Sequence, residues 1–260
     1  MQKRLTLVAL ICLILNALLI AAPADDFGNA IIKGKKLIEK GTQKFDEKTL
    51  MDARSHFERL LQNEEMQWLT HYYIGYTDSR LATYYQVQNN KEMLLKYLDD
   101  GIEHIYSSLE KNEKFADAHG LLSSLLGQKI STDPALGMTL GMESMTAISD
   151  ALEYGKENPR VAMFAAISAY FTPEQFGGSK TKAMSEMTRA AELFKKENLE
   201  DKRLPDWGHD QALTWLGRFH TAAGEFDLAT KNLQAALKLS PESSFAKSSQ
   251  EQLKQKMAEK

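Results

Sequence analysis

The chain has 260 residues, with 32 lysines and arginines against 35 aspartates and glutamates, so its formal charge at neutral pH is only −3. This balance excludes the strongly basic surface that is typical of nucleic-acid binding, and we expect no nucleic-acid partner. A single cysteine excludes an internal disulfide framework. With only six prolines and with Ala, Leu, Lys, Glu and Met prominent, the composition favours helices nearly throughout.

Residues 1–24 have the pattern of a secretory signal peptide. Lys3 and Arg4 precede an apolar run over residues 5–20, and Ala22-Pro23-Ala24 forms a small-residue cleavage site. We expect cleavage after Ala24, and hence export of the chain. Because the remaining chain has no cysteine and so no disulfide, a bacterial periplasm is favoured over eukaryotic secretion. The alternative is a retained anchor, although the run is shorter than the roughly 20 residues that span a bilayer. After cleavage we expect no stable membrane insertion.

The chain after the leader divides into five predicted pairs of helices. Hydrophobic periodicity predicts the first helix of each pair over residues 29–40, 67–86, 115–129, 159–171 and 208–223. It predicts the second helices over residues 47–62, 90–111, 136–155, 179–197 and 225–239. Turn-forming residues such as Asn89-Asn90, Asp133-Pro134 and Gly177-Gly178 separate them.

Each predicted second helix contains the same short pattern. A small residue is followed four positions later by a bulky or aliphatic one, and seven and eight positions later by two small or aliphatic residues. These offsets place the set on one helical face. The small residues start the sets at intervals of 48, 43, 39 and 46 residues, a period typical of helical solenoids. The sets begin at Ala53, Gly101, Ser144, Ala183 and Ala229.

The last unit resembles a tetratricopeptide repeat (TPR). Trp215-Leu216-Gly217, Gly224, Ala229, Ala236-Leu237 and Pro241 stand at the spacing of that repeat. The resemblance implies an all-α fold, a right-handed α-solenoid of about five TPR-like helix pairs followed by a capping helix. The TPR-like domain would cover residues 25–241, in units of roughly 29–62, 67–111, 115–155, 159–197 and 208–241, with a capping helix and tail at 242–260.

Two connections are longer than a tight turn. Residues 172–180 contain Phe176 and two glycines, and residues 198–208 contain Trp207. A large aromatic side chain beside glycine usually packs against its surroundings. We therefore expect Phe176 and Trp207 to plug the ends of the helix layers.

The resemblance also implies a concave groove lined by the first helices. An extended or helical peptide would stack on the tyrosines and present a carboxylate to Arg80 or Arg218. The alternative is that Tyr72 and Tyr76 pack against the first unit. The groove residues would be Tyr72, Tyr76, Arg80, Ser124, Gln128, Gln211, Thr214, Arg218 and Thr221, with Ala162, Ala165 and Ala169 in a smooth middle part.

No catalytic or cofactor motif is present in the sequence. The patterns H-E-x-x-H, G-x-S-x-G and G-x-G-x-x-G are absent, and residues 177–181 lack the order of a phosphate-binding loop. None of the six histidines forms the i, i+4 pair that binds a metal on a helix. We therefore predict a non-enzymatic protein without a cofactor or a metal site.

Three methionines form the one pattern in the sequence that could also bind a metal ion. Met138, Met142 and Met145 share one helical face at offsets of four and seven. We expect this face to be core, because methionine fills irregular gaps well. The alternatives are a Cu(I) site, since thioethers are soft ligands, and an apolar partner surface.

The sequence thus favours a non-enzymatic TPR-type adaptor in the cell envelope that binds a peptide or protein segment in its groove. The alternative is a small-ligand-binding accessory protein of an envelope transport system, since solenoids can enclose apolar ligands between helices.

Overall fold

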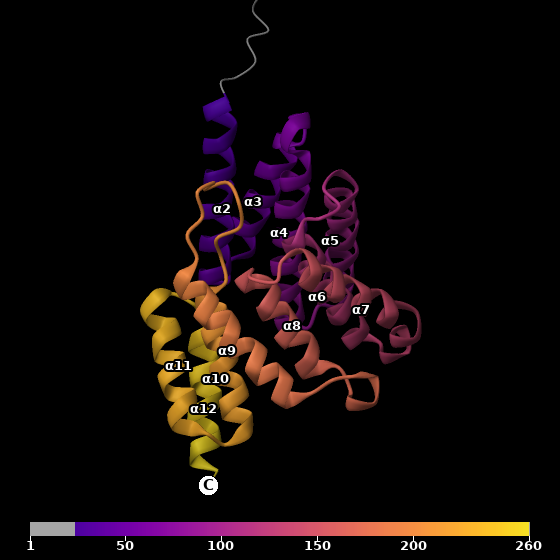
Figure 1. Ribbon diagram of the computed structural model, residues 1–260. Helices are drawn as coiled ribbons and strands as arrows, with labels where there is room; N and C mark the ends of the chain where they lie inside the picture. The colour runs from indigo at the N-terminus through magenta and orange to yellow at the C-terminus, as the bar shows by residue number, and fades with distance from the viewer. Residues whose placement is uncertain (1–23, 260) are drawn as a thin grey trace, which may run out of the picture.

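The structure, a computed structural model, describes residues 24–259, which form eleven α-helices in successive pairs (Figure 1). The all-α class with paired helices is confirmed. The first three pairs are α2 (Ala24–Lys44) with α3 (Glu47–Leu60), α4 (Gln67–Val87) with α5 (Lys91–Lys111), and α6 (Ala116–Thr132) with α7 (Gly137–Tyr154). The last two are α8 (Pro159–Phe171) with α9 (Lys180–Lys196) and α10 (His209–Ala223) with α11 (Phe226–Leu239), and α12 (Ser244–Ala258) follows.

Three short 3₁₀ helices lie in the connections, at Glu64–Met66, Pro134–Leu136 and Glu174–Phe176. Residues 1–23, which hold nearly all of the expected leader, lie outside the described residues, so the leader stays a prediction. From α2 to α12, no helix combines the length and the apolar character needed to cross a bilayer.

Short polar side chains begin many of the helices. Each accepts a hydrogen bond from a backbone N–H two or three residues later, which satisfies a donor that has no partner in the first helical turn. These residues are Asp46, Asn90, Asn158, Ser179 and Ser243. At the other end of α10, Gly224 has a φ of 76°, and this left-handed conformation makes the tight turn expected from the repeat pattern.

The small residues of the repeated pattern lie where paired helices approach most closely. Ala53, Gly101, Ala183 and Ala229 are all buried. On the partner helix, a Cβ added to Gly75 would lie 2.7 Å from Ile105 Cδ1, closer than packed atoms come. In the third pair Ser123 replaces this glycine, and its hydroxyl oxygen lies 3.2 Å from that of Ser144. The degenerate unit therefore joins its helices by a hydrogen bond.

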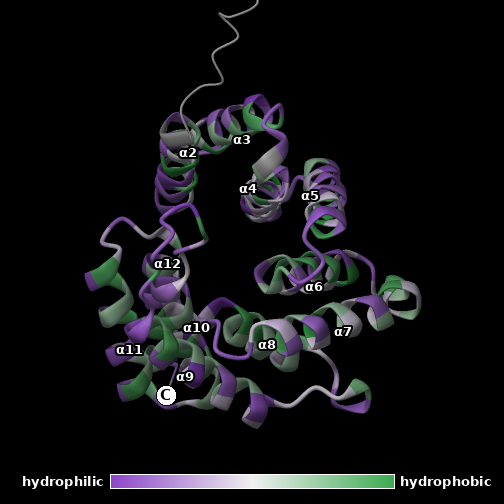
Figure 2. Ribbon diagram, turned by 45° about the horizontal axis from the view of Figure 1, so that its top comes forward, coloured by the Kyte–Doolittle hydropathy of each residue, from purple (hydrophilic) through white to green (hydrophobic). Residues whose placement is uncertain are grey.

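The helix pairs are arranged as a ring whose two ends meet (Figure 2). α12 packs against α10 and α11 and also contacts α2, and Gln43 donates a hydrogen bond to the Ser240 hydroxyl over 3.4 Å. The long connection between α9 and α10 passes over α2 (Figure 1). We call this connection, residues 197–208, the strap.

The two aromatic residues of the long connections behave differently. Trp207, in the strap, packs against both of the two largest buried clusters, so the expected packing is confirmed for it. Phe176 is 63% exposed, so the same expectation is wrong there. Its connection closes by its own backbone hydrogen bonds, including one of 3.1 Å from Gly178 N to Pro173 O, and needs no packed side chain.

The expectation for the three methionines of α7 is also wrong. Met138, Met142 and Met145 are 94%, 74% and 51% exposed. Ala147 and Ala151, on roughly the opposite side of the helix, are the buried residues of α7. Close packing of α7 on its neighbours selects these small side chains and leaves the methionines in solvent.

Candidate functional site

The strap covers the tyrosines of α4. The Trp207 ring stacks on Tyr76 at a centroid distance of 4.1 Å, and its Nε1 donates a hydrogen bond to the Tyr72 hydroxyl over 3.2 Å. Trp207 also meets Phe164 of α8 edge-on at 5.9 Å. Tyr72 and Tyr76 are consequently buried, and burial raises the pKa of both hydroxyls. These two predicted groove residues face the chain's own indole ring.

Lys35 of α2 holds the outer part of the strap. Its ammonium donates hydrogen bonds of 2.7 Å to the carbonyl oxygens of Lys202 and Leu204 and lies 3.0 Å from the Asp206 carboxylate. Burial lowers the pKa of Lys35. Since two carbonyls and a carboxylate take up its three donor directions, the strap is tied to the first unit of the ring.

Arg160 of α8 holds the inner part of the strap. Its side chain is 2% exposed, forms an ion pair of 2.6 Å with Asp117 and a second with Glu197, and donates a hydrogen bond of 3.2 Å to the Trp207 carbonyl oxygen. Burial disfavours the charged guanidinium, but the two carboxylates more than offset it and raise the pKa of Arg160. The strap is therefore fixed at both of its ends.

Predicted residues of the second and fifth units lie side by side under the strap. Arg80 Nη1 donates to Gln211 Oε1 over 3.3 Å, and Gln211 Nε2 donates to the Tyr76 hydroxyl over 3.2 Å. The Arg80 guanidinium also lies 5.0 Å from the Tyr76 ring centroid. The structure thus brings three predicted groove residues together, but they form hydrogen bonds with one another. Their role in binding a partner stays a prediction.

The remaining predicted residues are mostly engaged within their own helices. Thr214 and Thr221 donate hydroxyl hydrogen bonds of 2.8 Å to the carbonyl oxygens of Asp210 and Gly217. The Gln128 side-chain oxygen is buried without a partner, while Ser124 is half-buried. Of the three alanines, Ala162 and Ala165 are buried and Ala169 is half-buried.

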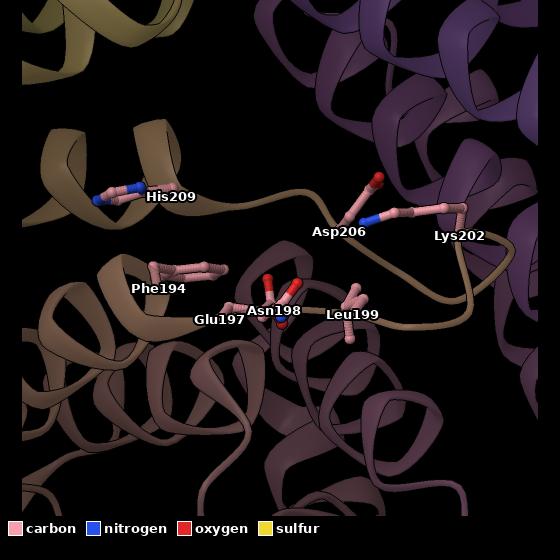
Figure 3. Close-up of a pocket in the computed structure, with 7 residues that line it drawn as sticks. All are labelled: Phe194, Glu197, Asn198, Leu199, Lys202, Asp206 and His209. Carbon is pink, nitrogen blue, oxygen red and sulfur yellow. The ribbon is translucent and has the colours of Figure 1, made fainter.

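A shallow pocket lies between the two arms of the strap (Figure 3). It is lined by Phe194, Glu197, Asn198, Leu199, Lys202, Asp206 and His209. The His209 ring stacks on Phe194 at 5.6 Å, its Nε2 is buried without a hydrogen-bond partner, and burial lowers its pKa. The pocket is mostly polar and open, so it lacks the apolar enclosure of a small-molecule site.

The fourth and fifth units, together with α12, form a second face that the strap leaves open. Arg218 of α10 lies 5.0 Å from the Trp215 ring centroid and 5.5 Å from that of Phe245 on α12. Phe171, 60% exposed at the end of α8, meets Trp215 edge-on at 5.7 Å. Beside it, Lys180 lies 3.4 Å from the Tyr170 ring centroid. We call these residues, Tyr170, Phe171, Lys180, Trp215, Arg218 and Phe245, the open face.

Arg218 has an unusual environment for a half-buried arginine. Within residues 24–259 no carboxylate forms an ion pair with it, and burial lowers its pKa. The guanidinium therefore keeps its five donors on an aromatic base, where a carboxylate of another molecule can bind in bidentate geometry. Arg218 was predicted from the sequence, but its aromatic partners were not. Tyr170-Phe171 at the end of α8, and Trp215 and Phe219 within the neighbouring first helix α10, were the available signal.

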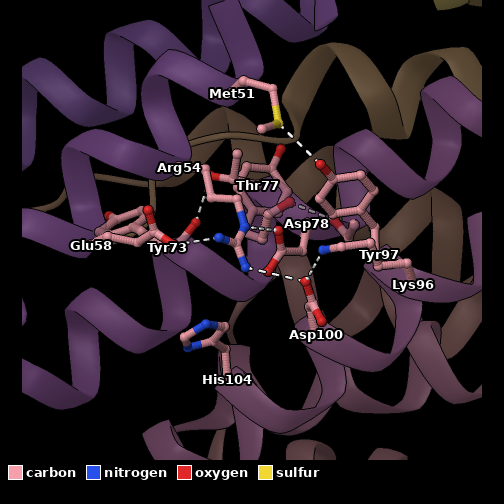
Figure 4. Close-up of polar contacts among 12 residues, drawn as sticks. Met51, Arg54, Glu58, Tyr73, Thr77, Asp78, Lys96, Tyr97, Asp100 and His104 are labelled. Atoms are coloured by element: carbon pink, nitrogen blue, oxygen red, sulfur yellow. Dashed lines mark hydrogen bonds and ion pairs between the residues drawn. The ribbon is translucent and has the colours of Figure 1, made fainter. Parts of the chain in front are cut away.

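A network of ion pairs connects α3, α4 and α5 (Figure 4). Arg54 Nε donates to Asp78 Oδ1 over 2.7 Å and Nη2 to Asp100 Oδ2 over 3.3 Å. Asp78 is fully buried, its second oxygen has no hydrogen-bond partner, and burial raises its pKa to about 7 in spite of Arg54. No sequence motif marks this network, and we assign it to the packing of the three helices.

Two histidines form a pair across α4 and α5. Nδ1 of His71 lies 3.0 Å from Nδ1 of His104. Burial lowers the pKa of both, that of His104 to about 4. In the described part of the chain, no group of three or more His, Cys, Asp or Glu residues is placed to hold a metal ion.

Solved structures with the same architecture confirm a TPR-like helical repeat fold. The HusA haemophore from Porphyromonas gingivalis matches with a TM-score of 0.59 and 20% identity, over 76% of this chain and 93% of that protein. TTC0263, a thermophilic TPR protein of Thermus thermophilus, matches with a TM-score of 0.58 and 14% identity, over 86% of this chain and 99% of that protein. No protein-family model matches the sequence, and no curated protein does either.

Proposed function

We propose that this chain is a non-enzymatic adaptor of the cell envelope that binds a peptide or protein segment on its open face. TPR-like solenoids present side chains of several units to one partner. The observation that carries the proposal is Arg218, a half-buried cation with no carboxylate of the described chain, which lies between Trp215 and Phe245. The leader pattern of residues 1–24 supports an envelope location.

The chemistry of the open face defines the segment that it binds. Phe171 and Trp215 offer ring surface for an apolar or aromatic side chain. Arg218 offers charge-assisted hydrogen bonds to a carboxylate, and Lys180, which donates one hydrogen bond to the Tyr170 carbonyl oxygen, has two further N–H donors. A segment with an aromatic or aliphatic residue next to an acidic residue, or with a free C-terminal carboxylate, satisfies both groups.

Photo-crosslinking in the intact host tests this proposal. A benzophenone amino acid at position 171 is expected to capture a defined partner, and the same probe at Leu228, which is exposed on α11, is not. Arg218→Glu is expected to remove the adduct, since a charge-assisted bond contributes about 1.5–3 kcal/mol, which corresponds to about tenfold or more in affinity. Arg218→Lys, which keeps the charge, is expected to retain part of it. An adduct that survives Arg218→Glu contradicts the proposal.

A second candidate is an apolar, anionic small ligand, and one comparison favours it. HusA, which shares the fold, is described as a haemophore. A planar ring with carboxylates matches the same two groups, the aromatic surface of Phe171 and Trp215 and the cation of Arg218. Titration with haemin, followed by absorbance, would then give one site per chain that Arg218→Glu weakens. A titration without a saturable, Arg218-dependent change in absorbance excludes haem as the ligand. The peptide or protein segment is then the remaining candidate for the open face.

A further inference from the structure

The exposed methionines of α7 are the feature that neither the fold nor the proposed function uses. They lie on a different helix pair from the open face, on α7, whereas the open face belongs to α8, α9, α10 and α12. Elsewhere in the described chain Met163 and Met187 are 2% and 0% exposed, as methionine usually is in a core. The exposure of Met138, Met142 and Met145 therefore needs its own explanation.

Apart from Tyr154, the last residue of the helix, the exposed large apolar side chains of α7 are all methionines. The branched aliphatic side chains of this helix, Leu140, Ile148 and Leu152, pack against buried clusters. Around the methionines the exposed residues are polar, with Thr139 and Thr146 next to them in the sequence. A surface for an apolar partner normally includes aliphatic or aromatic side chains. This one offers thioethers on an otherwise polar helix face.

The spacing of the three residues suits a single ion. At about 100° and 1.5 Å per residue, they lie within an arc of about 60°, with Cα atoms about 6 Å and about 4.5 Å apart along the axis. The unbranched side chain has three rotatable bonds, so the sulfur atoms can converge. Gly141 leaves the face clear, because a Cβ there would meet no atom within 4 Å.

The charges of α7 also favour a cation. The helix has no lysine or arginine, and its charged residues are the acids Glu143, Asp150 and Glu153. Glu143 accepts a hydrogen bond from the Tyr106 hydroxyl of α5 and lies about 100° around the helix from Met142. Neutral thioethers prefer soft monovalent ions such as Cu(I) and Ag(I) over Zn(II), Mg(II) or Ca(II).

We propose that Met138, Met142 and Met145 form a surface site for one soft monovalent metal ion, Cu(I) in the cell and Ag(I) as its redox-stable equivalent. The site binds the ion through three sulfur atoms and needs no proton transfer, since a thioether has no proton to lose. Because the site lies outside the open face, metal binding and partner binding are separable properties.

The test is a titration of the purified chain with Ag(I), and with Cu(I) held by a competing chelator under reducing conditions. One ion per chain is expected, with shifts of three methionine methyl signals in NMR spectra. The variant Met138→Leu/Met142→Leu/Met145→Leu is expected to weaken binding by about tenfold or more, because only the sulfur donors are lost. Its circular dichroism and Tm are expected to be unchanged, since the side chains are exposed.

The matched control is Met257→Leu. Met257 is 50% exposed near the end of α12 and has no second exposed methionine on its helix, so its loss is expected to leave the stoichiometry and affinity unchanged. Equal Ag(I) binding by the wild type and the triple-leucine variant overturns the proposal. Loss of partner crosslinking in the triple variant, with no metal binding by the wild type, also overturns it and assigns the face to a protein partner.

Discussion

The part of the ring under the strap and the open face differ although both rest on the same repeat. Under the strap, the polar groups of Tyr72, Tyr76 and Arg80 form hydrogen bonds with Trp207 and Gln211 of the same chain. On the open face, Arg218 lies on aromatic rings with no carboxylate of residues 24–259 to pair with it. A repeat thus supplies positions for binding residues, while the connections between repeats decide which of these positions stay accessible.

The largest expected effect follows from removing the strap's aromatic anchor. Trp207→Ala removes the stacking on Tyr76 and the hydrogen bond to Tyr72 and leaves a cavity between two buried clusters. We expect the free energy of unfolding to fall by about 3 kcal/mol, as measured by urea denaturation. Trp215→Ala, on the open face, is expected to cost less stability but to weaken partner binding. If both variants lose the same stability, the strap does not hold the ring as described.

Two glycine variants show whether the paired helices pack equally closely in the two parts of the ring. A Cβ at Gly75, on the helix whose tyrosines the strap covers, would lie 2.7 Å from Ile105 Cδ1 of α5, and one at Gly217, on the helix that carries Arg218, would lie 2.5 Å from Leu233 Cγ of α11. We expect Gly75→Ala and Gly217→Ala each to lower the free energy of unfolding by about 1–3 kcal/mol. A strongly unequal loss, measured by urea denaturation, would mean that the seams differ.

The next prediction concerns how the free energy of unfolding depends on pH. Two groups of α4 and α5, Asp78 and His104, are expected to contribute to this dependence with opposite signs. The pKa of Asp78 is raised to about 7 in the folded chain, so its contribution is present below pH 4 and is lost as the pH rises through 7. The pKa of His104 is lowered to about 4, so its contribution is present above pH 6.5 and is lost as the pH falls through 4. Between pH 4 and 6.5 the two groups oppose each other.

Two variants separate these contributions. Relative to the wild type, the free energy of unfolding of His104→Gln is expected to fall with rising pH between 4 and 6.5, by up to about 1.4 kcal/mol per pH unit, because the rising contribution of His104 is absent. Relative to the wild type, that of Asp78→Asn is expected to rise with pH between 4 and 7, because the falling contribution of Asp78 is absent. Urea denaturation at a series of pH values measures both slopes. Slopes of the same sign in the two variants would contradict the assignment. Arg218→Lys on the open face is expected to leave the wild-type profile unchanged.

The smallest expected effect is a gain in stability at Gly127, and this variant is the control for the two glycine variants above. Gly127 lies inside α6, and a Cβ there would meet no atom within 4 Å. Gly127→Ala is therefore expected to raise the free energy of unfolding by about 0.5–1 kcal/mol, because alanine loses less backbone entropy in a helix. A loss of stability in the same denaturation assay would show that this face of α6 is not free.

Helix pairs were predictable from the sequence, but which faces they bury was only partly so. The pattern at Ala53, Ala183 and Ala229 predicted the seams correctly, because close helix approach needs small residues whatever the rest of the fold. For Met138 and Met142, helical spacing showed that they share a face but not that the face is inward. The same pattern at Ser144 and Ala151 already marked a different inward face of α7.

The candidate site was less predictable because it depends on contacts between distant units. Arg80 and Gln211 are 131 residues apart in the sequence and meet only because the ring closes. No local signal places Trp207 over Tyr76, since this requires the length and path of the strap. The position of Arg218 on its helix could be predicted because it follows from the repeat pattern of that helix, while its role in binding stays a prediction.

Closure of the ring limits how this protein can change in evolution. An open array of repeats gains or loses a unit at little cost, because each unit contacts only its neighbours. Here Lys35, in the first unit, holds the carbonyl oxygens of Lys202 and Leu204 before the last pair, and α12 touches α2. Duplication or deletion of one helix pair would pull these partners apart. We therefore expect the number of repeats to change less readily than in an open array, and variation to concentrate in surface residues and in connections outside the closure.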